Sequence, residues 1–592
     1  MSRKRTYTLR QVKDRILASD SDSEFECSDI SDGTDDFDDD SLPVAAADSG
    51  STPVISTPVV NTPVPRVTDK TTWEWDIYDD RDDYCPEWLP QYQRRRGVLV
   101  DTSDFAPIDY FQLFFPDTLF DLIESETNRY ALQQLDSTND LPLHSRFREW
   151  TDTCQAEIKA YVALIISMGF CTKPTIADYW SSYWLTKTQF ADVMPRRRFE
   201  LLSSFLHFSN NEEQPERGSP NYNPLFKVQS MLDIVDPLYE SVYTPGRCLS
   251  VDESIVKFKG RVFFRQYLPS KPTRWGLKEF VLCESKTGYH LKHVIYTGRN
   301  TFERDEGVPF TTQLVTTLLQ GYKNMGHIVF TDNFYSSPDL FLLLKDKFGI
   351  GACGTVRINR KHMPHILQPS VLKLKKGDDP VFARYNELVA CAWHDTKRVH
   401  LLSTVHNNLT IDKQIRSKSE PSGYRTVEKP VMAEIYNKNM SGVDILDQKL
   451  GSYMYPHKCS KWYQTIFHRI IEIALVNGYI VYSSAHDDSD TGSRIISPVK
   501  FRSKVVDSLL DGYESPRVRT GRPSKKSLPV RLTGRHFISK LEGSSKPDCV
   551  VCSNRAAHKR KQTSYCCKAC GGIALCVTPC FERFHSVIDY QL

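Results

Sequence analysis

The sequence predicts a multidomain α/β protein with a disordered acidic N-terminus and a cysteine-rich C-terminus. Three observations support this fold class. Apolar residues follow a helical period from about residue 105 to 243, and predicted strands alternate with helices from about 247 to 358. Seven of the sixteen cysteines fall in the last 44 residues. Because 592 residues are too many for one hydrophobic core, we expect several domains.

The first 104 residues are expected to be disordered. Residues 20–40 hold eleven Asp and Glu and no Lys or Arg, and a stretch rich in Pro, Ser and Thr follows. Such a composition buries too little apolar surface to offset the entropy of folding. Residues 494–561, by contrast, carry seventeen Lys and Arg against five Asp and Glu. This asymmetry indicates a polyanionic partner, usually nucleic acid; a solvated basic linker is the alternative.

Membrane and secreted proteins are excluded by the apolar pattern. No stretch reaches the roughly 18 uncharged apolar residues of a membrane helix. The first ten residues, MSRKRTYTLR, lack the apolar segment of a secretory signal. The cysteines outside the C-terminal cluster are therefore expected to be reduced thiols of a folded core.

Residues 105–246 are predicted to form a helical unit. Its clearest helix has an expected stop at Gly169, and its apolar side chains recur at helical spacing: Ile158, Tyr161, Val162, Ile165 and Met168. Similar segments lie on both sides of this helix. The pattern establishes a helical unit but assigns no function to it.

Near Pro245-Gly246 the apolar period changes to that of strands. Predicted strands lie at 247–254, 261–268, 278–285 and 289–298, and a tight turn at Lys286–Gly288 joins the last two. A helix, a buried strand at 327–330, a helix capped by Ser337 and a strand at 351–358 follow. This succession of strands and helices predicts a mixed sheet covered by helices. Helices resume near residue 442 and continue through 461–482.

Carboxylates end two of the predicted strands and begin a later helix. Asp252 and Asp332 end strands, and Asp444 and Asp447 share one helix face. Each aspartate alone is typical of a turn or a first helical turn. If the two strands are neighbours and the helix packs over their ends, the carboxylates converge. Such a site suits Mg²⁺ or Mn²⁺ and two-ion phosphoryl transfer.

Long motifs resemble the piggyBac-type transposase family, in collinear order from about residue 98 to the C-terminus. They include CLSVDESIVKFKGRVFFRQYLPSKPTRWGLKEF, IVFTDNFYSSPDLF, GACGTVRINRK and MSGVDILDQ. The resemblance implies a ribonuclease-H-like catalytic core with a DDD triad, which Asp252, Asp332 and Asp444 match. Asp447 matches a further acid near the metals and is predicted to be catalytic as well. The implied activity is cut-and-paste transposition of double-stranded DNA through hairpin ends at TTAA targets.

The resemblance also implies a domain order. A helical DNA-binding and dimerisation domain (105–246 and 456–493) is split around the catalytic core (247–357 and 429–455), which contains an insertion domain (358–428). A basic linker (494–546) and a cysteine-rich domain (547–592) close the chain, which is expected to form a homodimer. Trp462 matches a family tryptophan near the active site, so we predict that it contacts DNA; a core aromatic is the alternative.

The C-terminal cysteines are spaced as zinc ligands. Short x₂ and x₃ loops place two sulfurs on one ion, and so few apolar residues cannot hold this segment folded without metal. The predicted ligands are Cys549, Cys552, Cys567, Cys570, Cys576, Cys580 and His585. Two full sites need eight ligands, and Cys566 and His558 are the candidates for the eighth.

A basic segment upstream, around Gly521-Arg522-Pro523 and Lys525-Lys526, is similar to an AT-hook that binds the minor groove. The usual Arg before the Gly is Thr520 here. Arg522, Lys525 and Lys526 are therefore predicted either to contact DNA or to form a nuclear import signal, and we expect the protein in the nucleus.

Two other functions compete with the transposase interpretation. One is a domesticated, transposase-derived DNA-binding or chromatin protein that no longer cleaves DNA. The other is a RING-type ubiquitin ligase, but the order of the cysteine pairs does not follow the RING pattern. No GxxxxGK, HExxH or GxSxG signature supports an ATPase, a zinc protease or a serine hydrolase.

Overall fold

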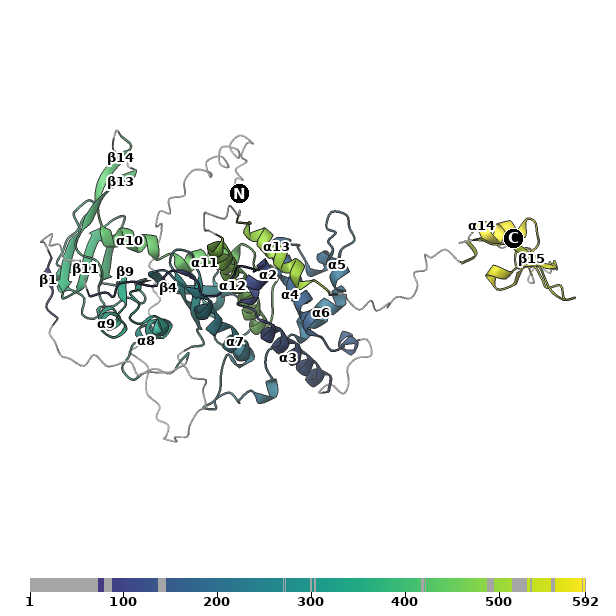
Figure 1. Cartoon of the computed structure of the whole chain (residues 1–592), viewed down its shortest axis with the longest axis horizontal. Coiled ribbons are helices and arrows are strands. Elements are labelled where there is room, and N and C mark those ends of the chain that lie inside the picture. Colours follow the sequence, from purple (N-terminus) through teal and green to yellow (C-terminus); the bar gives the residue numbers. More distant parts are fainter. Residues whose placement is uncertain are drawn as a thin grey trace, which may run out of the picture. The chain divides into compact units, whose positions relative to one another are not determined.

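The computed structural model describes most of the chain from Trp73 onward. The described residues are 73–78, 88–136, 145–269, 271, 273–298, 301–302, 305–416, 420, 422–486, 495–513, 530–532, 535–554, 559–587 and 589–590. They form two compact units, Met1–Ser515 and Pro516–Leu592, which are called unit 1 and unit 2 below. Figure 1 shows the elements of both.

Unit 1 is built on a ten-stranded mixed sheet. Its order is β1-β10-β11-β12-β9-β8-β4-β6-β5, and β7 also pairs with β6. β8 is parallel to both β4 and β9, whereas β4, β6 and β7 pair antiparallel. The strands are β1 (Asp76–Ile77), β4 (Cys248–Lys257), β5 (Gln266–Tyr267), β6 (Trp275–Glu284), β7 (His290–Ile295), β8 (Ile328–Thr331), β9 (Gly351–Thr355), β10 (Val381–Tyr385), β11 (Leu388–His394) and β12 (Arg398–Ser403).

The predicted mixed sheet is thus confirmed, with one difference in its strands. Of the predicted strand at 261–268 only β5 forms. Phe264 packs its ring against Trp462 instead, at a centroid distance of 5.2 Å. Arg265 donates to the carbonyls of Lys259 and Gly260, which closes this stretch into a loop. The turn at Lys286–Gly288 forms as predicted between β6 and β7.

Helices that precede and follow the sheet in sequence pack on one another. α12 lies against α2 and α7, and α13 against α4 and α2. The helices of unit 1 are α2 (Pro107–Gln112), α3 (Asp117–Asp136), α4 (Gln155–Phe170), α5 (Phe190–Val193), α6 (Arg196–Phe205), α7 (Phe226–Val242), α8 (Phe310–Leu318), α9 (Pro338–Leu343), α10 (Val431–Asn439), α11 (Gly442–Gly451), α12 (Trp462–Ala485) and α13 (Pro498–Leu509). Among the described residues, no helix is both long and apolar enough to cross a bilayer.

Part of the predicted basic linker is a core helix. α13 lies within residues 494–546 and buries one face, on which Phe501 and Val505 are fully covered. Its Arg502 forms a buried ion pair with Glu472 of α12, with an N–O distance of 2.8 Å. The high positive charge of the stretch hides this amphipathic face in the sequence.

Part of the predicted disordered region is also ordered. Residues 73–78 and 88–104 belong to the described structure, whereas the acidic residues 20–40 lie outside it. Trp73 stacks on His362 and Tyr385, and β1 pairs with β10. Farther on, β2 (Gly97–Val98) pairs with β3 (Tyr243–Thr244). Aromatic side chains therefore hold this segment on the sheet despite its polar surroundings.

The predicted insertion, residues 358–428, extends the main sheet. It supplies β10, β11 and β12, which reach the rest of the sheet through the β12–β9 pair. β13 (Thr410–Arg416) and β14 (Tyr424–Pro430) form a separate two-stranded ribbon, labelled in Figure 1.

Unit 2 is a small domain with little regular structure. β15 (Ile538–Lys540), β16 (Tyr565–Cys567) and β17 (Ile573–Ala574) form a three-stranded sheet, and α14 (Cys580–Ser586) follows. Its core is dominated by cysteines, with Val551, Leu575 and Phe584 as the apolar members. Because β15 pairs with β16, the folded part begins upstream of residue 547.

Candidate active site and metal centres

Asp252 and Asp332 lie side by side because of the register between two parallel strands. Val251 of β4 is the partner of Thr331 of β8. Each aspartate is the next residue along its strand direction, so the two lie side by side at the edge where β8 ends. Asp332 directly follows its strand as predicted, whereas Asp252 does not end one: it lies within β4, which continues to Lys257, and pairs with Val281 of β6. The sequence-based expectation that these two strands are neighbours is confirmed.

Short hydrogen bonds orient both carboxylates. The backbone N–H of Glu253 donates to Oδ1 of Asp252 at 2.8 Å, and the Thr355 hydroxyl donates to Oδ1 of Asp332 at 2.9 Å. Thr355 is the last residue of β9, the next parallel strand. Among the described residues, no donor is bonded to Oδ2 of Asp252 or of Asp332. One oxygen of each side chain is therefore left for another ligand.

Helix α11 brings Asp444 to this edge through two glycines. A Cβ on Gly442 would lie 2.2 Å from the Ser250 hydroxyl and 3.0 Å from the Cα of Ser285. Gly288, at φ +67°, faces the same helix, where a Cβ would lie 2.8 Å from the Leu446 nitrogen. Only residues without a side chain allow the helix to approach β4 and the β6–β7 turn this closely. Asp444 lies in the first turn of α11.

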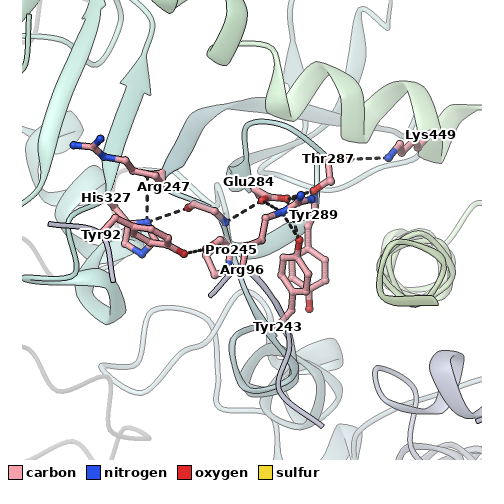
Figure 2. A network of polar contacts seen from close by, with 11 residues as sticks. Tyr92, Arg96, Tyr243, Pro245, Arg247, Glu284, Thr287, Tyr289, His327 and Lys449 are labelled. Carbon is pink, nitrogen blue, oxygen red and sulfur yellow. Dashed lines mark hydrogen bonds and ion pairs between the residues drawn. The ribbon is translucent and has the colours of Figure 1, made fainter. Parts of the chain in front are cut away.

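A buried glutamate supports the turn on which α11 rests. Figure 2 shows Glu284 between Arg96, Tyr243 and Thr287, with Lys449 of α11 reaching the turn. Glu284 forms an ion pair with Arg96, and it accepts hydrogen bonds from the Thr287 hydroxyl and from the Gly246 N–H, the latter at 2.9 Å. The Lys449 ammonium donates to the Thr287 carbonyl at 2.7 Å. These bonds connect the N-terminal segment to α11.

The electrostatics of the edge favour a bound cation. Burial, together with repulsion from Glu253 and Asp332, raises the pKa of Asp252 to about 8, although the Lys271 ammonium opposes the shift. The pKa of Asp444 is raised by partial desolvation and by Asp447, and again lowered by Lys271. Lys271 therefore faces both Asp252 and Asp444. The negative charge on this edge exceeds what Lys271 can balance.

Asp447 has a different environment from the other three aspartates. Its Oδ1 accepts a hydrogen bond from Ser254 at 2.6 Å and pairs with Arg469 of α12 at 3.2 Å. Asp447 lies one turn after Asp444 on the same side of α11, as the sequence predicts.

Trp462 lines a basic and aromatic pocket of about 490 Å³. It is the first residue of α12 and is half-buried against Phe264. The residues that line this pocket come mainly from the segment before α7 and from the loop that follows β4. Its cationic residues are Arg217, Lys227, Arg261 and Arg265, and its other aromatic residues are Tyr222, Phe263 and Phe264. Cations beside exposed aromatic rings suit the phosphates and bases of nucleic acid.

Unit 2 holds two groups of metal-ligand side chains. The first is Cys549, Cys552, Cys576 and Cys580, and the second is His536, Cys567, Cys570 and His585. The ligand atoms of each group lie within 4.8 Å of one another. Within the described residues these two are the groups so closely gathered, and the aspartates of unit 1 are more widely spaced.

The two groups have the geometry of tetrahedral sites. Zn–S bonds of about 2.3 Å place sulfurs roughly 3.8 Å apart, and the Cys552 and Cys576 sulfurs are 3.8 Å apart. In the second group the Cys570 sulfur lies 3.3 Å from Nδ1 of His536 and 3.5 Å from Nε2 of His585. Nδ1 of His585 is 2.7 Å from the Phe581 carbonyl, an outer bond that fixes the tautomer. The two sites interleave along the chain.

The eighth side chain gathered in the two groups differs from both sequence candidates. It is His536; Cys566 is buried in β16 outside both groups, and His558 lies outside the described residues. His536 stands in the stretch predicted to be linker, thirteen residues before the first cysteine of the cluster. The count of seven predicted ligands indicated that one more residue was needed. The spacing of the cysteines gave no reason to look thirteen residues upstream of the cluster.

The three predicted DNA-contacting residues of the basic segment, Arg522, Lys525 and Lys526, lie outside the described residues. The geometry of unit 1 and unit 2 does not bear on them.

Comparisons with known proteins agree with this arrangement. A family model described as "Transposase IS4" matches residues 106–479, and one described as "DDE_Tnp_1-like zinc finger" matches residues 531–586. Human PiggyBac transposable element-derived protein 2 is 26% identical over 439 residues, which are 71% of this chain and 69% of that protein. Human PiggyBac transposable element-derived protein 3 is 25% identical over 515 residues, covering 83% and 78%.

One solved structure is also similar. It is the cryo-EM structure of a piggyBac transposase synaptic complex with hairpin DNA, with a TM-score of 0.59 and 26% sequence identity. The match covers 70% of this chain and 83% of that one.

Proposed function

Because this chain belongs to the piggyBac-type transposase family, we propose that it is a cut-and-paste DNA transposase with Asp252, Asp332 and Asp444 as its catalytic triad. The observation that carries the proposal is the β4–β8 register, which aligns Asp252 with Asp332, while α11 brings Asp444 to face the same lysine. The strand order β7-β6-β4-β8-β9 supports a ribonuclease-H-like core.

The residues of the triad fit a hard divalent cation, Mg²⁺ or Mn²⁺. They offer oxygen ligands alone, and Oδ2 of Asp252 and of Asp332 is free of described donors. Burial raises the pKa of Asp252, and a bound cation would favour its charged form. Bound as a pair, such ions stabilise both the attacking and the leaving oxygen of a phosphoryl displacement. Asp252, Asp332 and Asp444 would hold them, and Thr355 fixes the rotamer of Asp332.

Double-stranded DNA is the proposed substrate. The Trp462 pocket joins four cationic side chains to the loop directly after the Asp252 strand, so phosphates bound there would lie along the approach to the triad. The solved relative was determined with hairpin DNA as a synaptic complex. Its likeness supports hairpin ends as part of the proposal. TTAA target sites and a homodimer, which the family resemblance implies, complete it.

Unit 2 is proposed to bind two structural zinc ions. The four-ligand groups of sulfur and imidazole match tetrahedral Zn²⁺, and a core this small needs metal to fold. Together with Arg522, Lys525 and Lys526 upstream, it forms a basic region suited to element ends and to nuclear import. Action in the nucleus is part of the same proposal.

A domesticated DNA-binding protein is the second candidate, because the two human relatives are named as transposable element-derived proteins. A DNA cleavage assay with the purified protein distinguishes the two functions. We expect it to nick and join DNA that carries the terminal repeats flanking its own coding sequence, in the presence of Mg²⁺ or Mn²⁺. Tight binding of these ends without cleavage in either ion would favour the domesticated protein.

A further inference from the structure

A single buried guanidinium joins two of the elements that carry the proposed triad, β4 and α11. Arg469 of α12 has a side chain only 3% exposed. Its Nε pairs with Glu279 of β6 at 3.2 Å, and its Nη2 donates to Ser254 of β4 at 2.6 Å and to Asp447 of α11 at 3.2 Å. Ser254 in turn donates to the same oxygen of Asp447 at 2.6 Å. We call Ser254, Glu279, Asp447 and Arg469 the Arg469 clamp.

On β4 and on α11 a clamp residue lies close to a triad aspartate. Ser254 lies two residues after Asp252 on β4, so both side chains point to the same face of the sheet. Ser254 and Glu279 are register partners across β4 and β6. Asp447 lies one helical turn after Asp444. The clamp thus fixes the distance between the strand that carries Asp252 and the helix that carries Asp444.

Asp447 differs from the triad aspartates because the clamp supplies it with a positively charged partner. Asp447 already faces a fixed cation, Arg469, and this pairing lowers its attraction for a divalent ion. Asp444, by contrast, forms no hydrogen bond or ion pair with any described side chain. On one face of α11, Asp447 is therefore bound to protein side chains, whereas Asp444, one turn earlier, can bind another ligand.

We propose that Asp447 is a positioning residue, which sets α11 on β4 through Arg469 and Ser254, and that it does not hold the catalytic ions. The inference rests on the proposed function and assigns Asp447 a role different from the one that the family resemblance implies. Asn at position 447 still offers an amide oxygen to Ser254 and Arg469, whereas Leu, of similar size, offers none. Asn is a poor ligand for a hard cation when it replaces a carboxylate.

The test uses the zinc-loaded full chain with Mn²⁺ as the probe, and measures both the Mn²⁺-induced rise in Tm and DNA cleavage. We expect Asp447→Asn to keep the Tm rise at an unchanged Mn²⁺ midpoint and to cleave about tenfold more slowly, because a charge-assisted bond becomes neutral. Asp447→Leu should cleave about 100-fold more slowly, as the helix shifts. Asp444→Asn should lose both the Tm rise and cleavage.

The results distinguish the two proposals. If Asp447→Asn folds like wild type by circular dichroism but loses the Mn²⁺ response, Asp447 is an ion ligand and the inference is overturned. Equal loss of cleavage in Asp447→Asn and Asp447→Leu would overturn it as well. If the wild-type chain itself neither responds to Mn²⁺ nor cleaves DNA, the proposed function fails. Should Asp447→Leu not fold, Ser254→Ala takes its place. It removes the two clamp bonds of Ser254 but keeps the Arg469–Asp447 pair, so a smaller loss of rate is expected.

Discussion

At the scale of single residues, the candidate active site depends on which carboxylates have a protein partner. Asp252 and Asp332 lie side by side on neighbouring parallel strands. Oδ1 of Asp252 accepts from the Glu253 N–H, whereas Oδ1 of Asp332 accepts from the Asn333 N–H and the Thr355 hydroxyl. Asp447 instead pairs with a buried arginine. The same residue type therefore has two roles within one site, and the partner of each side chain distinguishes them.

Neutralising one triad aspartate should abolish cleavage and leave DNA binding nearly intact. For Asp252→Asn, Asp332→Asn and Asp444→Asn we expect a loss of about 10³-fold or more in cleavage rate, since an oxygen ligand of the ions is removed. Asn also removes charge repulsion, so the domain should fold normally. The measurement is strand cleavage at equal protein concentration, beside a band-shift affinity.

Asp233→Asn is the matched control, because Asp233 is an exposed aspartate of α7 away from the edge. It should cleave like wild type. Wild-type cleavage by Asp332→Asn would contradict the triad assignment.

His536 should be a zinc ligand and Cys566 should not. We expect two zinc ions per chain by elemental analysis, and His536→Ala should reduce this to about one while lowering the Tm of unit 2. Cys566→Ser and His558→Ala should retain both ions. Full zinc content in His536→Ala, or loss of an ion in Cys566→Ser, would return the eighth ligand to a sequence candidate.

At the scale of elements, α11 is the part whose position matters most. It packs against β4 and the β6–β7 turn through Gly442 and Gly288, and it is fixed by the Arg469 clamp and by Lys449 (Figure 2). The helix that carries Asp444 therefore has little room to move. The position of α11 is therefore set by packing between segments that are far apart in the sequence.

Adding one methyl group at Gly442 should displace α11. The Cβ of Gly442→Ala would lie 2.2 Å from the Ser250 hydroxyl and 3.0 Å from backbone, so the helix must shift. We expect a cost of about 1–3 kcal/mol in stability and roughly 100-fold in cleavage rate. Gly451→Ala on the same helix meets nothing within 4 Å and is the control. Equal rates for the two variants would show that α11 tolerates displacement.

The local sequence pattern predicted helices and strands well where apolar residues recur with a regular period. The strands that carry Asp252 and Asp332, the helix after Ser337 and the long helix at 461–482 all form near their predicted positions. The helix predicted to stop at Gly169 ends one residue later, at Phe170, and the missing side chain of Gly169 admits the Tyr453 carbonyl. His536, α13 and the Arg469 clamp were missed for the same reason: each depends on contacts between residues far apart in the chain.

At the scale of the whole molecule, charge is divided between an acidic head and a basic C-terminal region. Residues 20–40 carry eleven acids, and residues 494–561 have a net charge of 17 − 5 = +12. Because α13 belongs to the core of unit 1, the basic region that can be removed without damage begins near residue 516. Both segments should affect DNA binding through salt-dependent electrostatics.

Deleting residues 516–592 should weaken DNA binding and flatten its salt dependence. Each phosphate contact contributes about −0.9 to the slope of log affinity against log salt. We therefore expect a shallower slope and a loss of selectivity for element ends, measured by fluorescence anisotropy over a salt series. An unchanged slope would mean that the basic region serves as a linker or an import signal and does not contact DNA.

Removing residues 1–60 should raise DNA affinity at low salt. We expect the acidic head to compete with DNA for the basic surface as a like-charged mimic, so the gain in affinity should fade as salt screens the competition. Binding of full-length and truncated chain at low and at high ionic strength tests this. Equal affinities at low ionic strength would leave the acidic head with a solubilising role only.

Excision of an element in living cells tests the central claim most directly. A donor plasmid carries the terminal repeats that flank the coding sequence, placed at a TTAA site inside a reporter, and receives either the wild-type chain or Asp252→Asn. We predict that wild-type chain restores the reporter with precise TTAA junctions, and that Asp252→Asn at the same protein level restores none. Equal reporter recovery with both proteins, or none with wild type while it binds the ends tightly, would contradict the assignment of this chain as an active transposase.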